Sequence, residues 1–212
     1  FPSVTNGTHS ALRDFISARP GIRIKKGAII FQQGDPITHL FFLNQGFAEI
    51  LRINGDNPDQ VISICREGTL IGASIPSRAA IYDLTARTLC NVWVTPVPVP
   101  ELMSALQRNG ELKRDLISEI GRQADLLSKE VNQLKTRSLA QRLACLFVSL
   151  VETQRTHTLS LPIAKQDLAR WLGVSPSSLS RTLRELKQIG IQFRKKTIHI
   201  VDFEYARTFC YD

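Results

Sequence analysis

The chain has 212 residues, of which 43% are hydrophobic and 22% are charged, and its formal net charge is +8. This length suits two small domains, and the apolar content is sufficient for packed cores, which excludes a globally disordered protein. No apolar run approaches the roughly 18–20 residues that a membrane span needs, and no signal peptide is visible, so we expect no membrane partner.

The positive charge is unevenly distributed along the chain. Residues 1–134 contain 14 Lys and Arg against 13 Asp and Glu, whereas residues 135–212 contain 13 against 6. The C-terminal part therefore carries nearly all of the excess. Such an asymmetry indicates that this part alone binds a polyanion.

The four cysteines lie far apart in the sequence, at Cys65, Cys90, Cys145 and Cys210. Because no two of them form a Cys-x-x-Cys pair, their spacing excludes a zinc ribbon and a thioredoxin-type motif. A chain of this size builds ordinary cores without a disulfide framework. We therefore expect reduced thiols in a cytoplasmic protein, with no metal site and no cofactor.

The predicted elements begin with a short helix over residues 11–16. From Ile22 to about Pro100, short apolar or alternating runs are separated by Gly, Pro, Asn and Asp, a pattern typical of a β-sandwich or barrel. Asn54-Gly55-Asp56 suits the tip of a hairpin, where the backbone requires a positive φ. The runs predicted as strands include residues 28–31, 40–43, 47–51, 61–64 and 92–94.

A long helix is predicted over residues 111–136, with a length of roughly 40 Å. Its apolar residues follow a 3-4-3-4-3 spacing and form a stripe as narrow as a coiled-coil seam. Helix stripes usually pack on their own domain, but the length of this helix and the narrowness of its stripe favour a parallel homodimer. The predicted interface residues are Ile117, Ile120, Ala124, Leu127, Val131 and Leu134.

A second helix, predicted over residues 139–151, is apolar on most sides and is expected at the centre of a small core. No Gly or Pro separates it from the long helix. The boundary between the two is therefore predicted to be a hinge near Thr136-Arg137-Ser138 rather than a flexible linker.

Residues 163–186 have the pattern of a helix-turn-helix, after a short strand predicted over residues 158–161. Gly173 provides the tight turn, Ser175 suits the N-cap of the second helix, and Pro176 occupies the favoured first helical position. The core side of the second helix is predicted to consist of Leu179, Leu183 and Leu186.

The outer side of that second helix carries hydroxyl and guanidinium groups, which contact base edges and phosphates in protein–DNA complexes. Residues 189–201 then read as a hairpin with a basic tip, a wing. An ordinary helical hairpin with a solvated polar face is the alternative, but the wing and the local charge favour DNA binding. The predicted DNA-binding residues are Ser177, Ser178, Ser180, Arg181, Arg184, Arg194, Lys195 and Lys196.

This arrangement resembles the bacterial CRP/FNR superfamily of transcription regulators, the relatives of the cyclic-AMP receptor protein and the fumarate–nitrate reductase regulator. Residues 26–36, 39–46 and 67–72 resemble strands of the family's sensor barrel and the approach to its effector pocket. Residues 167–181 resemble its helix-turn-helix. Each piece alone is weak, but the combination in this order is specific and covers nearly the whole chain.

The resemblance implies an α+β fold in three parts: a β-roll sensor of the cyclic-nucleotide-binding type over residues 1–110, a dimerisation helix over 111–136, and a winged helix-turn-helix over 137–212. It implies a homodimer that binds a roughly two-fold symmetric operator in double-stranded DNA. RNA polymerase is a further expected partner if the protein is an activator. No enzymatic activity is expected, and the effector is an unknown small molecule.

The sequence departs from the family at the effector pocket, which the resemblance places at Gly72 and Arg78. Family members that bind cyclic nucleotides have a glutamate after this glycine, which holds the ribose, but Ala73 stands here. Arg78 lies near the place of the phosphate-binding arginine, although the intervening stretch is short. We therefore expect a pocket that has diverged from cyclic-nucleotide binding, with Arg78 as a surface loop residue.

Two further departures concern metal centres and base recognition. No cysteine precedes Cys65, so the N-terminal cluster of the iron–sulfur members is missing from these residues, and the four histidines are scattered. Cys65 and Cys90 are expected to be structural rather than redox-responsive. Many members carry a recognition-helix glutamate at the position of Ser177, whereas Ser180 and Arg181 match the family's Ser-Arg pair.

Two other functions compete with a DNA-binding regulator. A cyclic-nucleotide-binding signalling module that acts on a protein partner would bind nucleotide without affinity for DNA, and Ala73 argues against it. A cupin-like barrel enzyme would need clustered His and acidic ligands, but His39 is the one histidine within residues 22–100.

Overall fold

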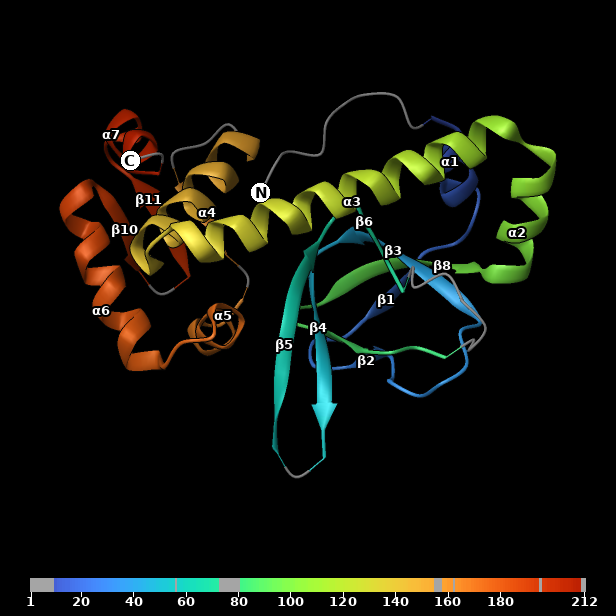
Figure 1. The fold of residues 1–212 in the computed structure, drawn as a ribbon, viewed down its shortest axis with the longest axis horizontal. Helices are drawn as coiled ribbons and strands as arrows, with labels where there is room; N and C mark the ends of the chain where they lie inside the picture. Colours follow the sequence, from blue (N-terminus) through green and yellow to red (C-terminus); the bar gives the residue numbers. More distant parts are fainter. Residues whose placement is uncertain are drawn as a thin grey trace. The chain divides into compact units, whose positions relative to one another are not determined.

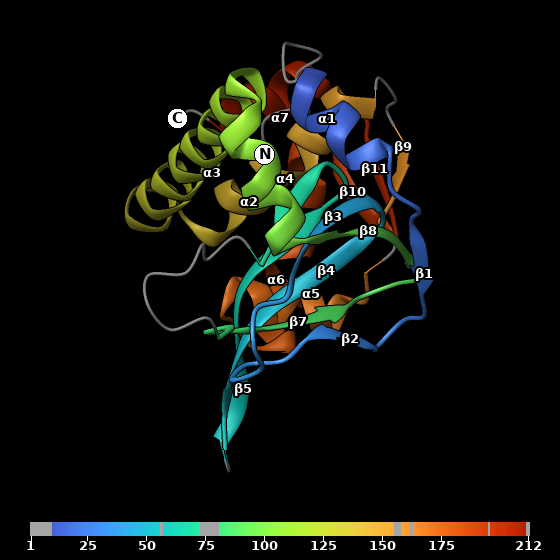
Figure 2. The same cartoon turned by 90° about the vertical axis from the view of Figure 1, so that its right-hand side faces the viewer.

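The structure is a computed structural model that describes residues 10–55, 57–72, 81–154, 158–161, 163–194 and 196–210. The described residues form two compact units, which divide between Ser118 and Glu119. The first unit is rich in strands and the second in helices (Figures 1 and 2). The α+β class predicted from the sequence is confirmed.

The strand-rich unit, which we call the sensor unit, contains two four-stranded antiparallel sheets. Their strand orders are β1-β8-β3-β6 and β2-β7-β4-β5. The strands are β1 (Ile22–Ile24), β2 (Ile29–Phe31), β3 (His39–Gln45), β4 (Phe47–Asn54), β5 (Asn57–Arg66), β6 (Thr69–Ile71), β7 (Thr85–Thr88) and β8 (Val92–Pro98). The predicted runs lie in these strands. The predicted hairpin tip is also confirmed, since Asn54 pairs with Asn57 and Gly55 has a φ of 58°.

Alternation along the strands places apolar side chains between the two sheets. Leu43 on β3 and Val94 on β8 pack against Ala48 on β4, and none of the three is accessible to solvent. A second cluster joins Phe31, Ile71 and neighbouring residues from both sheets. Side chains at positions i and i+2 of a strand share a face, so the period of two seen in the sequence generates this core.

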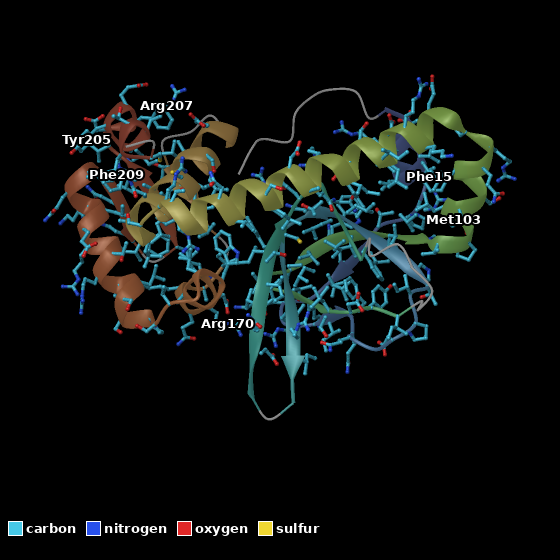
Figure 3. All side chains as sticks on the ribbon, in the orientation of Figure 1. Phe15, Met103, Arg170, Tyr205, Arg207 and Phe209 are labelled. Carbon is cyan, nitrogen blue, oxygen red and sulfur yellow. The ribbon has the colours of Figure 1, made fainter. Side chains whose placement is uncertain are left out.

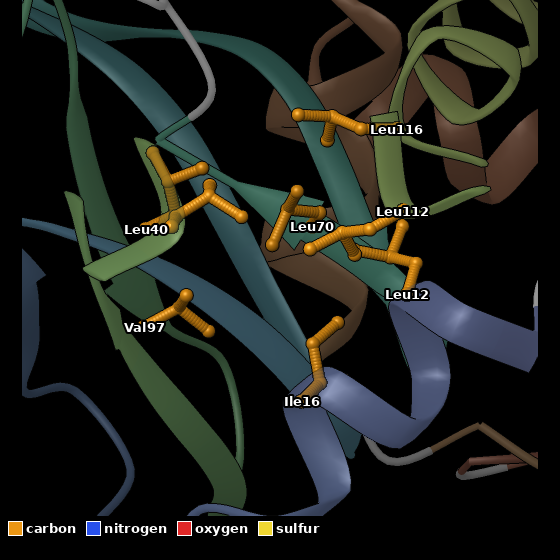
Figure 4. Close-up of a cluster of buried hydrophobic side chains, with 8 residues drawn as sticks. Leu12, Ile16, Leu40, Leu70, Val97, Leu112 and Leu116 are labelled. Atoms are coloured by element: carbon orange, nitrogen blue, oxygen red, sulfur yellow. The ribbon is translucent and has the colours of Figure 1, made fainter. Parts of the chain in front are cut away.

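Three helices cover the outer face of the first sheet: α1 (Ser10–Ser17), α2 (Val99–Arg108) and the first turns of α3 (Gly110–Thr136). Phe15 on α1 packs toward the sheet, whereas Met103 on α2 is 46% exposed (Figure 3). The cluster that they bury is shown in Figure 4 and consists of Leu12, Ile16, Leu40, Leu70, Val97, Leu102, Leu112 and Leu116.

Helix α2 was not predicted as a separate element from α3. Asn109 separates them with an extended backbone, φ −127° and ψ 102°. Its side-chain oxygen accepts hydrogen bonds from the backbone N–H groups of Glu111 and Leu112, at 3.0 and 3.1 Å. Asn109 therefore ends one helix and caps the next, which satisfies two of the N–H groups that a helix start leaves unpaired.

The helix-rich unit, which we call the winged-helix unit, is built around α4 (Leu139–Gln154). It contains α5 (Lys165–Leu172), α6 (Pro176–Leu186), the 3-10 turn η1 (Lys187–Ile189), α7 (Phe203–Phe209) and a sheet of order β10-β11-β9. The strands are β9 (Thr158–Ser160), β10 (Ile191–Arg194) and β11 (Thr197–Ile200). Helix α7 was not predicted from the sequence. Asp202 caps it by accepting the N–H of Tyr205 at 2.9 Å.

The predicted break between α3 and α4 is present at Arg137 and Ser138. Ser138 Oγ accepts the N–H of Gln141 at 3.2 Å, and Gln141 Oε1 accepts the N–H of Ser138 at 2.9 Å. This reciprocal pair is a capping box, which starts α4 without any glycine or proline.

The core of the winged-helix unit forms around α4. Leu143 and Phe147 are fully buried, and the Phe147 ring stacks on Phe193 of β10 with centroids 5.9 Å apart. Leu168 of α5 and Leu179 of α6 are also fully buried. No helix within the described residues is long and apolar enough to cross a membrane.

Because Leu168 is fully buried in this core, shortening its side chain should destabilise the winged-helix unit. We expect Leu168→Ala to lower the free energy of unfolding of this unit by about 2–5 kcal/mol, because it removes buried methyl groups and leaves a void. Urea unfolding followed by circular dichroism measures the change. Val201→Ala is the control, since Val201 is 62% exposed and its truncation should cost little. An equal loss in both variants would contradict the core described above.

Candidate nucleic-acid interface

The turn between α5 and α6 is fixed by backbone hydrogen bonds and a side-chain cap. Gly173 ends α5 with a φ of 68°, and its N–H donates to the carbonyl of Arg170 at 3.1 Å. Ser175 Oγ then accepts the N–H of Ser178 at 3.1 Å, and Pro176 occupies the first turn of α6. The turn, the N-cap and the helix start predicted from the sequence are all confirmed.

Helix α6 has one buried and one exposed face. The buried residues are Leu179, Thr182, Leu183 and Leu186. Ser177, Ser178, Arg181 and Arg184 are exposed, and Ser180 is half-buried. The packing of the leucines thus sets the rotation of the helix and turns its two arginines toward solvent.

The outward-facing side chains of α6 differ in the hydrogen bonds that they form within the winged-helix unit. Ser180 Oγ donates to the carbonyl of Pro176 at 2.6 Å, and Arg184 Nε donates to the carbonyl of Ser180 at 3.4 Å. Ser177 Oγ lies 2.8 Å from Ser175 Oγ. Arg181 has no hydrogen-bond or ion-pair partner among the residues that the structure describes. Its five N–H donors are therefore directed at solvent.

The predicted wing is present as the hairpin of β10 and β11, in which Arg194 pairs with Thr197. Arg194 and Lys196 are exposed near its tip. Lys195, which was assigned to the same surface, lies outside the described residues. Strand β9 completes the sheet, and the Leu161 N–H donates to the Lys196 carbonyl at 2.6 Å, which ties the wing near its tip to the residue after β9.

The candidate effector pocket in the sensor unit begins at Gly72, directly after β6. Gly72 has a φ of +80°, and a Cβ placed on it would lie 3.3 Å from the ring of Tyr82 and 3.4 Å from that of Phe31. These two rings stack with centroids 4.2 Å apart. Ala73 and Arg78 lie outside the described residues. The described surroundings of Gly72 are thus aromatic, and both rings pack closely against the glycine.

Tyr82 was not identified as a pocket residue from the sequence. Its hydroxyl donates to the carbonyl of His39 at 2.6 Å, which holds the ring in place. Burial raises the pKa of Tyr82 above its usual value. No local sequence pattern predicts the contacts of Tyr82 with Gly72 and His39, which are seen only in the tertiary structure.

Arg87, on strand β7 of the sensor unit, forms ion pairs with two carboxylates. Arg87 contacts Glu49 on the neighbouring β4 at 2.6 Å and Asp59 on β5 at 3.5 Å. Glu49 is only 1% exposed, so this ion pair is largely shielded from solvent. The ion pairs link β7 to β4 and β5 within the second sheet, and they hold the Arg87 guanidinium against protein carboxylates.

The described residues contain no group of three or more His, Cys, Asp or Glu side chains that could hold a metal ion. His39 Nδ1 lies 3.0 Å from Thr38 Oγ1, and its ring lies beside Phe41. Cys65 and Cys90 are half-buried and pack against the clusters between the sheets. These positions match the structural roles expected for them.

The apolar stripe of helix α3 is buried at the start of the helix and exposed further along it. Leu112 and Leu116 are buried in the sensor unit. The residues predicted for dimerisation continue this stripe on the same side of the helix and are exposed, with Ile117 60%, Ile120 40%, Leu127 54% and Val131 50% accessible. Ala124 is exposed as well, and the side chain of Leu134 lies outside the described residues.

Comparison with known proteins gives matches over both units. The family model for a cyclic nucleotide-binding domain matches residues 22–109, and that for a Crp-like helix-turn-helix domain matches residues 141–205. Similar relatives include the transcriptional activator protein anr of Pseudomonas aeruginosa, 24% identical over 86% of this chain and 77% of the relative. The nitrogen fixation regulation protein FixK of Rhizobium meliloti is 26% identical over 88% and 85%.

Solved structures share the fold of the whole chain. FixK2 of Bradyrhizobium japonicum aligns with a TM-score of 0.77 at 17% identity, over 90% of this chain and 96% of that one. CooA of Carboxydothermus hydrogenoformans aligns with a TM-score of 0.72 at 14% identity, over 97% of each. The two matched domains, their order and the named relatives agree with the fold and with the helix-turn-helix described above. The chain therefore belongs to the CRP/FNR superfamily of transcription regulators, a family without enzymatic activity.

Proposed function

We propose that the protein is a cytoplasmic homodimer that binds a specific, roughly two-fold symmetric DNA operator. In this proposal residues 1–110 form the sensor, residues 111–136 the dimerisation helix and residues 137–212 the DNA-binding domain. The observation that carries the proposal is the exposed, unengaged guanidinium of Arg181 on a helix whose opposite face is fully packed.

The recognition helix of this proposal is α6. Arginine donates two parallel hydrogen bonds to guanine O6 and N7 in the major groove, so Arg181 would read a guanine in each half-site. Arg184 and the hydroxyls of Ser177 and Ser178 would contact adjacent bases and phosphates. Ser180 would act mainly as an acceptor, since its proton is already donated to Pro176.

Contacts to phosphate would come from the wing. Arg194, Lys195 and Lys196 lie in the segment that carries the net +7, and such contacts position a protein on the duplex without reading sequence. Ser177 replaces the glutamate of many relatives. A hydroxyl both donates and accepts, so discrimination should be weaker at the base that it faces.

A second copy of the chain is the proposed partner of the α3 stripe. Large apolar side chains spaced for a coiled-coil seam are unfavourable in water, and pairing two helices along the seam would bury them. A dimer would also hold two α6 helices at the separation of successive major grooves, about 34–36 Å.

The sensor is proposed to respond to a ligand other than a cyclic nucleotide. Ala73 lacks the ribose-binding carboxylate, Arg87 is committed to Glu49 and Asp59, and aromatic rings pack beside Gly72. Arg78 is proposed to be a loop residue rather than a phosphate ligand. Because several relatives are named transcriptional activators, RNA polymerase is a proposed further partner.

The reading role of Arg181 is tested by Arg181→Ala. Loss of a bidentate contact worth about 1–3 kcal/mol should weaken specific operator binding roughly 10–100-fold per half-site, with a much smaller effect on random duplex. Fluorescence anisotropy at fixed salt measures both affinities, with an operator first isolated by selection from random duplexes. Arg207→Ala on α7 removes the same charge from the same unit and is the matched control (Figure 3). Unchanged specific binding in Arg181→Ala would refute the assignment.

The dimer is tested by placing a charge in the stripe. Leu127→Glu should shift the protein from dimer to monomer in sedimentation velocity, because two carboxylates would have to be desolvated at the seam. Met103→Glu makes the same change at a comparably exposed leucine-sized residue on α2, outside the stripe, and should leave the dimer intact. A wild-type protein that sediments as a monomer would overturn this part of the proposal.

A measurement of cyclic-nucleotide binding distinguishes the proposed DNA-binding regulator from the alternative, a nucleotide-binding signalling module. Titration calorimetry of the full chain with cyclic AMP and cyclic GMP should give no saturable heat. A saturable heat that disappears in Arg78→Ala, together with no affinity for DNA, would instead support a nucleotide-binding signalling module that acts on a protein partner.

A further inference from the structure

Two cysteines of the winged-helix unit that are far apart in the sequence meet in the fold. Cys145 lies on α4, and Cys210 directly follows α7, which packs against α4 (Figure 1). Cys145 Sγ donates to the carbonyl oxygen of Cys210 at 3.4 Å, and Cys210 Sγ donates to the carbonyl oxygen of Ala206 at 3.3 Å. When Cys145 is ionised, the Cys210 thiol can donate to its sulfur instead. Both cysteines are free thiols.

An arginine completes the cluster. Arg137, in the break between α3 and α4, donates from Nη1 to Cys145 Sγ at 3.0 Å. A guanidinium beside a sulfur stabilises the thiolate over the thiol. Cys145 is half-buried and Cys210 is only 2% exposed, so the two sulfurs occupy different surroundings.

The cluster assigns different protonation states to its two sulfurs. The hydrogen bond from the Cys210 thiol, with the charge of Arg137, lowers the pKa of Cys145 to about 7 despite its partial burial. The pKa of Cys210 is raised by its hydrogen bond to Cys145 and by burial. At neutral pH a substantial fraction of Cys145 is therefore thiolate, while Cys210 retains its proton.

We propose that Cys145 and Cys210 form a peroxide-reactive dithiol, in which Cys145 is the nucleophile and Cys210 the resolving thiol. The geometric basis is the hydrogen bond from the Cys145 sulfur to the backbone of Cys210, with Arg137 Nη1 3.0 Å from the same sulfur. A thiolate that is paired with a cation and accompanied by a second thiol has the arrangement of a redox-reactive site. This site is independent of the operator and the effector of the proposed function.

The oxidation proceeds in two balanced steps. The Cys145 thiolate attacks one oxygen of a hydroperoxide, the O–O bond breaks, and hydroxide or alkoxide leaves with sulfenic acid on Cys145. The Cys210 sulfur then attacks the sulfenic sulfur, an S–S bond forms, and the S–O bond breaks. The hydroxyl departs as water with the Cys210 proton. Two thiols have lost two electrons, and the peroxide has been reduced to water or an alcohol and water.

The disulfide would have two structural consequences. It would close a covalent ring over residues 145–210, which includes α5, α6 and the wing. It would also remove the sulfur charge that Arg137 faces at the start of α4. Oxidation is therefore expected to stabilise the winged-helix unit against unfolding and to change the environment of the segment that connects it to α3.

The first test measures the reactivity of the wild-type, full-length chain. Pulsed alkylation with iodoacetamide, quantified by peptide mass spectrometry, should show the rate at Cys145 rising with pH through a midpoint near 7. Arg137→Gln should lower that rate at pH 7 by a few fold, because removing the cation raises the pKa of Cys145 while the hydrogen bond from Cys210 remains. Arg170→Gln, a change of equal charge on α5, where Arg170 pairs with Asp167, should leave the rate unchanged. A midpoint at or above 8.5 in the wild-type protein would overturn the proposal.

The second test identifies the oxidation product. Stoichiometric hydrogen peroxide should give a disulfide-linked pair of peptides containing Cys145 and Cys210, reversible by dithiothreitol. The same link should form in a variant with Cys65→Ser and Cys90→Ser. Cys210→Ser should instead accumulate a sulfenic acid at Cys145 that dimedone captures. Oxidation confined to Cys65 or Cys90 in the wild-type protein, or no oxidation at all, would contradict the assignment without touching the proposed DNA-binding function.

Discussion

The functional surface depends on the burial of the three leucines of α6. Leu179, Leu183 and Leu186 fix the rotation of the helix, while Ser175 and Gly173 fix where it begins and how the chain enters it. With the rotation set, Arg181 and Arg184 point outward. Because apolar and polar residues alternate with the period of the helix, burying the apolar side of α6 places its polar side toward solvent.

A single apolar stripe runs along α3. Its first turns are packed through Leu112 and Leu116, whereas its continuation through Leu127 and Val131 stays accessible. The stripe is therefore longer than the surface that the sensor unit covers. This imbalance is the physical reason to expect a second copy, and it arises from the arrangement of a few residues rather than from overall hydrophobicity.

Local patterns in the sequence were sufficient for β2, β3, β4, β5 and β8 of the sensor unit, for the long helix and for the helix-turn-helix, whereas no run was named at β1, β6 or β7. Alternation, capping residues and turn glycines act over a few positions, so Ser175, Pro176 and Gly173 could be assigned without the structure. The break lies at Asn109, an N-cap residue followed by Gly110, so a local signal was present, but no separate helix was assigned before Glu111. Helix α7 is only seven residues long and has too few apolar positions to show a period.

Contacts between distant segments could not be predicted in this way. Tyr82 reaches the carbonyl of His39 across 43 residues, and Cys145 reaches Cys210 across 65. From the sequence, Cys65 and Cys90 were the candidates for redox chemistry, yet the arginine-paired cysteine is Cys145. Spacing along the chain carries no information about such pairs when they come together only through the packing of α4 against α7.

The central claim is that Arg181 reads a base, and interference by guanine methylation tests it most directly. Methylation of guanine N7 removes the acceptor that an arginine would use in the major groove. The account predicts that methylating one guanine in each half-site prevents binding of the wild-type protein and has no effect on the residual binding of Arg181→Ala. Binding that is indifferent to N7 methylation in the wild-type protein, or equally sensitive in both proteins, would contradict it.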